Sequence, residues 1–484
     1  MKTIISNWYY IPWDRVSEQE LRRIKSALQV TPKKADMGLR NTTPPEPILM
    51  YSMEREGHIG VPLCWGVENY GEAEVDERTE GQPISVPKLP SPDHPRVSNP
   101  KAQKKFMKDV YNALLEKEYF IACASTGSGK TIVSLHATAK LGRTVIILVN
   151  TEALANQWVE EIKDKLGVPA DRIGRVQQGV CEYEGKDFCV GLKQSVGKRK
   201  YKKEFYSHFG VVISDEVHRD GAELFSKSLS AFNAKYKIGL SATPDRKDGL
   251  AVVFKNYLGE VSVVSEATSV PCVVYVMAYE PTFAIVKNYA RLVNNMSVDP
   301  QRNKLISRII KKGYDNDRQI LVVSDRIDQL YLLKEQCLEL GIPEDKMGYF
   351  CTAYVTGEQK YVRNKYGKSE WVYERKKNKK EDLARVKEES QIILATYAMI
   401  KEGIDIPRLD FGVDATPKSE ITQVIGRIRR PVPGKPMPFW YTIYDYVPEI
   451  EGRPRAANRL DGLFYARLRQ YKKDGNIEVR GLKR

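Results

Sequence analysis

Runs of consecutive apolar residues recur along the chain, and segments with helical periodicity separate them. Four such runs, YFIACAS, TVIILVN, GVVISDE and KYKIGLSAT, lie between residues 119 and 243. Strands that are apolar on both faces are typical of a parallel sheet that helices cover on each side. Between two of these runs, TEALANQWVEEIKDKL places its apolar residues at helical spacing, which predicts a helix there.

The same alternation returns in the C-terminal half of the chain. The pattern weakens near residues 262–272, and four further apolar runs then follow, QILVVS, SQIILAT, DFGVDAT and FWYTIYDYV. Two successive α/β units of similar size are the simplest interpretation, and no short-period repeat is visible. The predicted fold class is therefore α/β, with two tandem domains built on parallel sheets.

The N-terminal part of the chain has a different pattern. Residues 72–100 are rich in proline and charge and poor in large apolar groups, which is typical of a linker or an extended arm. A small module with the segments IISNWYYIPW and GVPLCWGV precedes it. The predicted organisation is an accessory domain at residues 1–90, a first α/β domain at 91–266 and a second at 267–484.

A highly charged segment, residues 357–390, interrupts the second predicted domain. KYVRNKYGKSEWVYERK can form two short strands around YGKS, with Gly367 at the turn. The aromatic residues available for one face are Tyr361, Tyr366, Trp371 and Tyr373. A β-hairpin that engages DNA and a disordered charged loop are both open interpretations.

The net charge of the chain indicates which class of partner it could bind. The 484 residues include 77 Lys and Arg against 62 Asp and Glu, and the formal net charge is +15. Such an excess favours a polyanionic partner, although it also fits a merely soluble basic protein. The seven cysteines form no CxxC pair, so no zinc site is expected, and they fit a reducing, intracellular setting. No apolar run reaches about 18 residues, so neither a membrane span nor a membrane partner is expected.

The segment ASTGSGKT has the context of a phosphate-binding loop. It follows the predicted strand YFIACAS and opens the amphipathic segment KTIVSLHATAKL. Gly127 and Gly129 allow backbone N–H groups to curl around phosphate oxygens. We expect Lys130 to reach the β- and γ-phosphates and Thr131 to offer its hydroxyl to magnesium. The alternative is a glycine-rich turn without a ligand.

A pair of carboxylates follows another predicted strand. GVVISDEVH ends in Asp215 and Glu216, at the edge where parallel sheets form their sites. Asp215 suits the magnesium shell, and Glu216 suits the orientation and deprotonation of an attacking water. His218 could hydrogen-bond to Ser241 or Thr243 of GLSATPDR. A solvated turn is the alternative for an isolated pair of this kind.

The segment QVIGRIRR contains three arginines whose binding partner has to be identified. Arg427 and Arg430 are three residues apart and would share one face of a helix. They could bind nucleic acid, or they could reach another site and stabilise charge there. Arg429 lies outside this spacing and is expected to face solvent or nucleic acid.

Together the segments ASTGSGKT, DEVH, SATP, ATYAMIKEGIDIP and QVIGRIRR resemble the superfamily 2 helicases of the DExH kind. Their order matches that family over residues 95–447, and LANQW and the small N-terminal module are most similar to XPB, RecG and the UvsW-type phage branch-migration enzymes. The resemblance implies two RecA-like domains that bind ATP, with Mg²⁺, in the cleft between them. It also implies an ATP-driven translocase on nucleic acid.

The resemblance assigns roles to individual residues. The catalytic group would be Lys130, Asp215, Glu216, Gln423, Arg427 and Arg430, of which the two arginines would act as arginine fingers. The residues that bind ATP would be Gln103, Ser125, Thr126, Gly127, Ser128, Gly129, Lys130, Thr131, Gly403 and Asp405. The metal ligands would be Thr131 and Asp215, and the residues that couple hydrolysis to movement would be His218, Ser241 and Thr243. The DNA contacts would be Thr151, Gln194, Ser195, Arg326 and Thr396.

The implied function is that of an ATP-dependent DNA helicase or translocase that remodels branched DNA in recombination, repair or replication, with 3′-to-5′ movement. Its partners would be single-stranded and branched duplex DNA and proteins of recombination or replication. Its place would be the cytoplasm, that of a bacterial host if the protein is encoded by a bacteriophage. The alternatives are an RNA helicase, an ATP-binding nucleic-acid clamp and the motor subunit of a restriction-type complex. The N-terminal module would assist substrate recognition.

Overall fold

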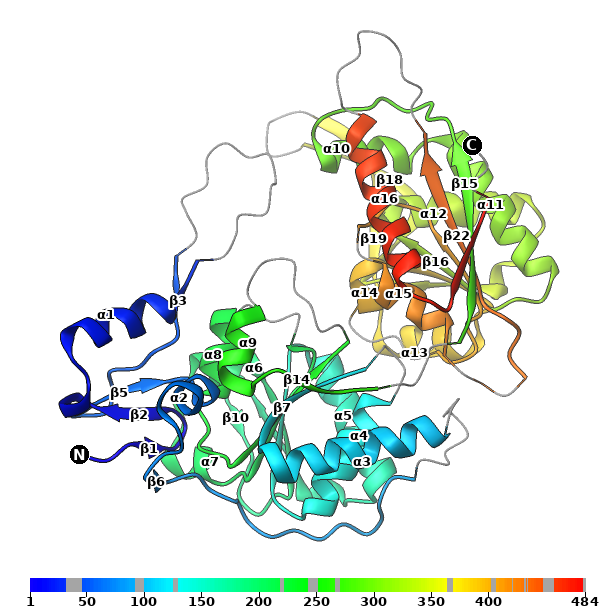
Figure 1. The fold of residues 1–484 in the computed structure, drawn as a ribbon. Helices are drawn as coiled ribbons and strands as arrows, with labels where there is room; N and C mark the ends of the chain where they lie inside the picture. Colours follow the sequence, from blue (N-terminus) through cyan, green and yellow to red (C-terminus); the bar gives the residue numbers. More distant parts are fainter. Residues whose placement is uncertain are drawn as a thin grey trace. The chain divides into compact units, whose positions relative to one another are not determined.

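The computed structural model divides the chain into two compact units, Met1–Ala267 and Thr268–Arg484, which are described separately here (Figure 1). The residues that the structure describes are 1–31, 46–91, 100–124, 129–217, 222–242, 251–265, 270–363, 369–401, 406–419, 421–430, 432, 434–446 and 457–481. Within this part of the chain, none of the helices combines the length and the apolar character needed to cross a membrane.

The first unit is built on an eight-stranded sheet in the order β10-β9-β11-β8-β12-β13-β7-β14. All neighbouring strands run parallel except β9 and β10, which are antiparallel. The strands are β7 (Tyr119–Cys123), β8 (Val145–Val149), β9 (Ile173–Gln177), β10 (Val180–Cys181), β11 (Phe188–Leu192), β12 (Val211–Ser214), β13 (Tyr236–Ser241) and β14 (Val261–Val264). The four apolar runs of this region are therefore strands β7, β8, β12 and β13, as the sequence predicts.

Helices cover both faces of this sheet. They are α3 (Pro100–Lys117), α4 (Lys130–Leu141), α5 (Glu152–Leu166), α6 (Lys193–Lys198), α7 (Lys203–Ser207), α8 (Ala222–Leu229) and α9 (Ala251–Leu258). Residues of β8 alternate between two hydrophobic clusters, with Ile147 in the cluster that α3, α4 and α5 share and Leu148 in the cluster that α8 and α9 share. A strand that is buried on both faces explains why TVIILVN is apolar at every position.

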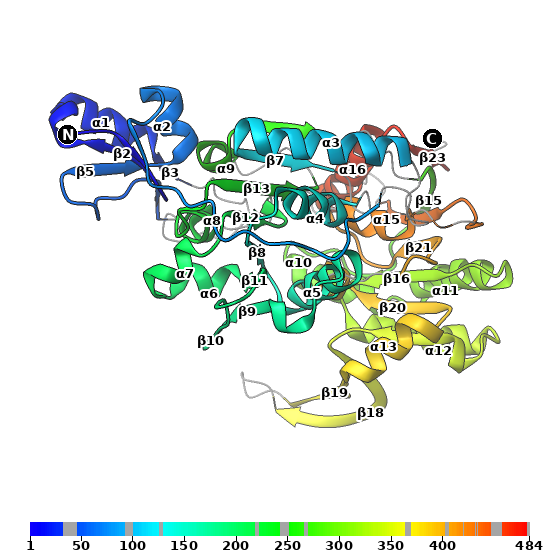
Figure 2. The ribbon, with the colours of Figure 1, turned by 90° about the horizontal axis from the view of Figure 1, so that it is seen from below.

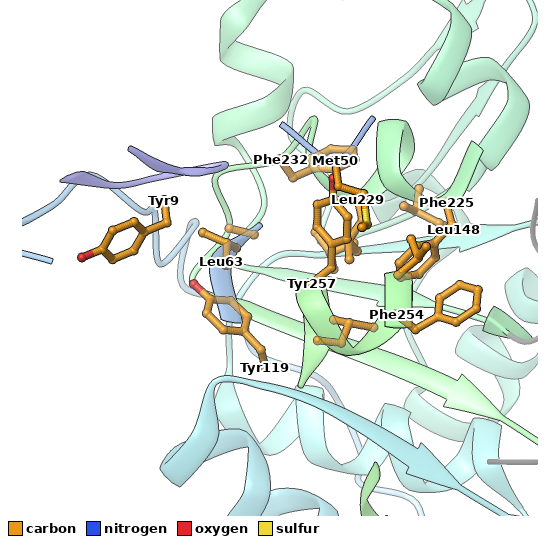
Figure 3. Close-up of a cluster of buried hydrophobic side chains, with 14 of the residues drawn as sticks. Tyr9, Met50, Leu63, Tyr119, Leu148, Phe225, Leu229, Phe232, Phe254 and Tyr257 are labelled. Atoms are coloured by element: carbon orange, nitrogen blue, oxygen red, sulfur yellow. The ribbon is translucent and has the colours of Figure 1, made fainter. Parts of the chain in front are cut away.

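The N-terminal module shares the second of these clusters. Its elements are β1 (Ile4–Ile5), β2 (Tyr9–Pro12), α1 (Glu18–Ala27), β3 (Gln29–Val30), β4 (Ile48–Leu49), β5 (His58–Val61), α2 (Leu63–Tyr70) and β6 (Val75–Asp76). Figure 3 shows Tyr9, Met50 and Leu63 of the module in the same cluster as Phe225 and Tyr257 of the first unit. The module thus belongs to the first compact unit, and its independence as a domain of residues 1–90 stays a prediction.

The segment after the module is an extended arm that lies along the first unit. Backbone N–H groups of Thr79, Ile84 and Lys88 donate to the carbonyls of Asn233, Gly142 and Leu166, at 2.9, 2.9 and 3.2 Å. These three bonds reach different elements of the unit. The arm is therefore fixed over its length between Thr79 and Lys88, rather than acting as a free linker.

The second unit has a seven-stranded parallel sheet in the order β17-β20-β16-β21-β22-β15-β23. Its strands are β15 (Cys272–Tyr279), β16 (Ile320–Ser324), β17 (Met347–Phe350), β20 (Ile392–Thr396), β21 (Phe411–Asp414), β22 (Phe439–Asp445) and β23 (Ile477–Arg480). Its helices are α10 (Tyr289–Ser297), α11 (Pro300–Asp315), α12 (Ile327–Glu339), α13 (Lys380–Glu389), α14 (Tyr397–Lys401), α15 (Thr422–Ile428) and α16 (Ala457–Lys473). The predicted α/β fold with two tandem parallel sheets is confirmed.

The charged segment of the second unit forms a long β-hairpin, as one of the two sequence interpretations predicts. Strands β18 (Ala353–Arg363) and β19 (Ser369–Lys377) pair antiparallel, with Tyr361 opposite Trp371 in the register, and Figure 2 shows the pair extending from the second unit. The residues at the predicted turn, Tyr366 and Gly367, lie outside the described residues. The interpretation as a disordered loop is wrong for the two strands.

The base of the hairpin is fixed to α12. The rings of Tyr331 and Tyr373 lie 5.2 Å apart, and Arg375 forms an ion pair with Asp328 at 2.8 Å. The pairing shifts register on either side of Gly357, which has a positive φ of 91°. A glycine bulge at this point bends the outer part of the hairpin relative to its base.

Candidate nucleotide-binding site

The last glycine of the phosphate loop is constrained by its neighbour as well as by its backbone. Gly129 precedes α4 with φ of 84°, a conformation that favours glycine. A Cβ atom at this position would lie 2.4 Å from Nε2 of Gln103 on α3. The residues before it, Ser125, Thr126, Gly127 and Ser128, lie outside the described residues.

Lys130 is the first residue of α4, and its cation lies between two acceptors. Its Nζ donates to the carbonyl of Ala124 at 2.9 Å and lies 3.8 Å from Oε1 of Glu216. The Lys130 side chain is only 10% exposed. A partly buried lysine at a helix N-terminus adds its charge to the backbone N–H groups there, which is an arrangement suited to phosphate. Thr131 follows it in the first turn of α4.

Asp215 follows β12 at the carboxyl edge of the sheet and is buried. Its Oδ2 accepts a hydrogen bond from the indole Nε1 of Trp158 at 2.9 Å, and its backbone carbonyl accepts one from Lys193. Burial, with a smaller contribution from the charge of Glu216, raises the pKa of Asp215, and the Trp158 bond and the charges of Lys130 and Lys193 oppose that rise. Burial and the charge of Glu216 disfavour the ionised form of Asp215, and a bound divalent cation would stabilise that form.

Glu216 is held in an unusual backbone conformation. Its φ is 50°, in the left-handed region, which costs a residue with a side chain about 1–2 kcal/mol. Such strain persists only where the surroundings enforce it, and it is typical of functional sites. The turn directs the Glu216 carboxylate toward Lys130, so the two acidic residues and the lysine predicted from the sequence are close together.

Gln103 lies where it could contact a nucleotide. It is 2% exposed, and its Nε2 has no hydrogen-bond partner among the described residues. A buried amide without a partner costs about 1–3 kcal/mol, and a ligand acceptor beside Gly129 would remove this cost. Its role in recognising adenine stays a prediction.

Other predicted residues of the first unit lie along the same edge of the sheet. Ser241 ends β13, and its carbonyl accepts from the N–H of Ala124 at 3.0 Å, beside the phosphate loop. The hydroxyl of Thr151 caps α5, and the hydroxyl of buried Ser195 accepts from the N–H of Gln178 at 3.0 Å, whereas Gln194 is exposed. His218 and Thr243 lie outside the described residues. The predicted DNA contacts Thr151 and Ser195 thus already have structural partners.

The arginine segment of the second unit differs from the prediction in two ways. Helix α15 ends at Ile428, so Arg430 lies beyond it and does not share a helix face with Arg427. Arg429 does not face solvent or nucleic acid, because it is 3% exposed and its Nε donates to the carbonyl of Val270 at 2.8 Å. It also forms an ion pair with Asp474. Gln423, Arg427 and Arg430 are each half-buried.

The remaining predicted residues of the second unit follow neighbouring strands. Thr396 ends β20 and pairs in register with Ser324 of β16, and Arg326 follows β16 two residues later. The guanidinium of Arg326 donates to Asn294 and to the carbonyl of Ala290, which ties it to α10. Gly403 and Asp405 lie outside the described residues.

Two residues that contact Asp215 are absent from the sequence prediction. Trp158 belongs to LANQW on α5, and Lys193 begins α6. Helix α5 follows β8 and α6 follows β11, and these two strands lie on the same side of β12 in the sheet order. The polar atoms of Trp158 and Lys193 reach Asp215 through tertiary contacts, and no local spacing in the sequence indicates them.

Comparisons with known proteins show which proteins this chain is similar to. A family model described as "Type III restriction enzyme, res subunit" matches residues 97–246, which include the phosphate loop and the acidic pair. A candidate ATP-dependent RNA helicase of Acanthamoeba polyphaga mimivirus is 26% identical over 445 residues, 89% of this chain and 79% of the viral protein. The chain is similar to helicases of superfamily 2 in these matches.

Two further comparisons are consistent with this similarity. A candidate DNA 3′-5′ helicase, Rad25, of Halobacterium salinarum is 32% identical over 25% of this chain and 20% of its own length. The structure of Saccharomyces cerevisiae Dbp5 bound to RNA and ADP BeF3 matches 78% of this chain and 88% of its own, at 12% identity and a TM-score of 0.50. The two α/β units therefore have the RecA-like helicase fold. The helicase relatives identify the protein as a nucleic-acid helicase that hydrolyses ATP.

Proposed function

We propose that this protein is an ATP-dependent DNA helicase or translocase of superfamily 2 that remodels branched DNA, with 3′-to-5′ movement. The observation that carries the ATP chemistry is the cluster of Lys130, Asp215 and Glu216 at the carboxyl edge of the first sheet. The net charge of +15 and a relative named as a DNA 3′-5′ helicase support DNA as the track.

The site residues divide the work as follows. The substrate is ATP with Mg²⁺, and the cation neutralises charge on the phosphates. Lys130 binds the phosphates, Asp215 and Thr131 hold the cation, and Glu216 orients and deprotonates the attacking water. Gln103 binds the nucleotide beside Gly129. Burial raises the pKa of Asp215 in the protein without ligands, so binding of the cation is expected to release any proton held there.

Arg427 and Arg430 act as arginine fingers in this proposal, and Gln423, Gly403 and Asp405 complete the response of the second unit to ATP. The two guanidinium groups stabilise charge on the transferring phosphoryl group. His218, Ser241 and Thr243 link hydrolysis to movement. The DNA strand is held by Thr151, Gln194, Ser195, Arg326 and Thr396, through hydroxyls, amides and one guanidinium that suit a phosphate backbone.

The rival functions differ in what stimulates hydrolysis. An RNA helicase is the nearest, because one relative is named as an RNA helicase. A restriction-type motor subunit has the support of the family model over residues 97–246. The steady-state ATPase rate is measured with single-stranded DNA, duplex, forked DNA and RNA as activators. Forked or single-stranded DNA should stimulate most. Stimulation by RNA alone would overturn the proposal of DNA, and an absence of any turnover would favour a nucleic-acid clamp.

A second experiment tests the arginine fingers. Arg427→Ala and Arg430→Ala should each lower the hydrolysis rate by about 10³–10⁵, with DNA affinity nearly unchanged. Arg469→Ala is the matched control, because Arg469 is an exposed arginine of the same unit. Normal hydrolysis with weak DNA binding and a salt slope lower by about one unit would show that the pair binds nucleic acid instead.

A further inference from the structure

The helix that carries Gln423 and Arg427, α15, is too short to be stable without contacts from other elements. α15 has 7 residues, and its N-cap residue, Ile421, makes no side-chain hydrogen bond to it. A helix this short is unstable in water by itself, because nucleation costs more than a few backbone bonds return. The direction of α15 must therefore come from contacts with other parts of the second unit.

Gln470 of α16 supplies the missing cap. Its Oε1 accepts from the backbone N–H of Ile421 at 3.2 Å and from the hydroxyl of Thr422 at 3.0 Å. Its Nε2 donates to the carbonyl of Ser419. A single side-chain amide thus contacts Ser419, Ile421 and Thr422, at or just before the start of α15. It satisfies one of the backbone donors that a helix start leaves unpaired.

Asp474 holds the other end of α15. Its carboxylate forms a two-pronged ion pair with Arg429, the C-cap residue of the helix, with one N–O distance of 3.2 Å. Burial alone would raise the pKa of Asp474, but the hydrogen bonds and charge of Arg429 hold it below its ordinary value. Asp474 is therefore ionised at neutral pH. The planar geometry of its pair with Arg429 restricts rotation of the end of α15.

Both contacts come from one turn at the end of α16. Asp474 follows the last residue of the helix, and its N–H donates to the carbonyl of Gln470 at 3.2 Å. On the C-terminal side of the arginine segment, Lys435 donates to the carbonyls of Arg430 at 2.9 Å and Pro407 at 2.8 Å. The main chain from Ser419 to Arg430 is thus held at its start, at the end of the helix and at Arg430.

We propose that Gln470 and Asp474 are positioning residues that set the direction of α15 and thereby aim Arg427 and Arg430 at the transferring phosphoryl group. This inference rests on the proposed role of those arginines. It predicts an effect on kcat with little effect on KM, because an arginine that acts only in the transition state contributes little to the binding of ATP.

The first test is Gln470→Met, which keeps the side-chain length and removes these three hydrogen bonds. It also removes a bond from Nε2 to the carbonyl of Ala466 within α16, at 3.3 Å. Because misplacement of a catalytic group by 1 Å can cost about 10²-fold, kcat should fall by roughly 10- to 100-fold, while KM for ATP and the Kd for single-stranded DNA change by less than about 2-fold. Gln470→Glu keeps the acceptor for Ile421 and Thr422 and should restore most of kcat. Arg469→Ala, one position away and exposed, should leave every parameter unchanged.

A double-mutant cycle separates positioning from a general structural effect. In the Arg427→Ala background, Gln470→Met should lower kcat by a smaller factor than in the wild type, because only Arg430 is left for it to position. An equal loss of kcat in both backgrounds, or a wild-type kcat in Gln470→Met, overturns the inference. If Arg427→Ala itself keeps a normal kcat, the proposed arginine-finger function fails instead.

Asp474→Asn serves if Gln470→Met does not fold. It keeps one acceptor oxygen for Arg429 but removes the charge. The expected result is the same fall in kcat at constant KM, and a smaller fall in the Arg427→Ala background. A normal kcat in a folded Asp474→Asn protein would contradict the positioning role.

Discussion

The hydrogen bond from Trp158 to Asp215 can be tested by Trp158→Phe, which keeps an aromatic ring and removes the indole N–H. The bond is 2.9 Å long and joins two buried groups. A hydrogen bond to a charged group contributes about 1.5–3 kcal/mol. A change of 1 kcal/mol shifts the melting temperature of a domain of about this size by roughly 2–4 °C. The bond alone should therefore be worth about 3–12 °C in the first unit.

Trp440→Phe is the matched control for the loss of ring volume. Trp440 is fully buried in the second unit, and its Nε1 has no hydrogen-bond partner within the described ranges. Its replacement loses comparable packing but no bond, and it removes a donor that was buried without an acceptor. The excess destabilisation of Trp158→Phe over Trp440→Phe, measured by circular dichroism on heating, reports the hydrogen bond.

The same variant should change how ATPase activity depends on pH. The Trp158 bond opposes the rise in the pKa of Asp215, so its loss raises that pKa further. The acid limb of the pH–rate profile should then move to higher pH in Trp158→Phe and stay in place in Trp440→Phe. If the two variants melt alike and the acid limb does not move, the bond has no role in holding Asp215 ionised.

Three further predictions follow from the described contacts. Asp215→Asn should abolish ATPase activity yet raise the melting temperature at neutral pH. The reason is that a raised pKa means that ionisation of Asp215 destabilises the fold as pH rises through that pKa. The gain in melting temperature should shrink on acidification, and a gain independent of pH would refute this cause. A second variant replaces residues 360–371 by a short Gly-Ser linker and leaves the contacts of Tyr373 and Arg375 at the hairpin base intact. It should preserve basal ATPase and slow the unwinding of forked DNA, because base–aromatic stacking contributes about 1–3 kcal/mol per base. A wild-type unwinding rate would exclude the hairpin as a separation element. A chain that begins at Ser91 should melt at a lower temperature or aggregate, because Phe225 and Tyr257 lose the module that covers them, and an unchanged melting transition would show that the module is dispensable to the core.

The elements that could be predicted from the sequence are those with a short-range physical signal. TVIILVN is apolar throughout because β8 is buried on both faces, and KTIVSLHATAKL follows its loop directly because Gly129 ends that loop. The hairpin can also be predicted from the sequence, because its two strands are adjacent in the chain and its charge contrasts with the surrounding apolar runs. The cluster of Lys130 and Glu216 follows from topology, because the carboxyl ends of parallel strands meet at one edge.

The parts that could not be predicted depend on partners far away in the chain. Spacing alone predicts that Arg429 faces solvent or nucleic acid, but Arg429 is buried because Asp474, 45 residues later, neutralises it. Trp158 meets Asp215 across 57 residues. Neither separation repeats a helical or strand period, so the pattern of apolar and polar positions contains no trace of these pairs.

The shared core between the N-terminal module and the first unit has a consequence for synthesis of the chain. Asn7 donates to the carbonyl of Ser230, 223 residues later, and Trp8 packs against Tyr257 at a ring distance of 5.7 Å. At about 5–20 residues per second, a ribosome needs roughly 10–45 s to make the partners that the module requires. During this interval the part of the module's core that packs against Phe225 and Tyr257 lacks those partners. The nascent module is therefore expected to depend on a chaperone, or on slow synthesis at low temperature, until α8 and α9 of the first unit emerge.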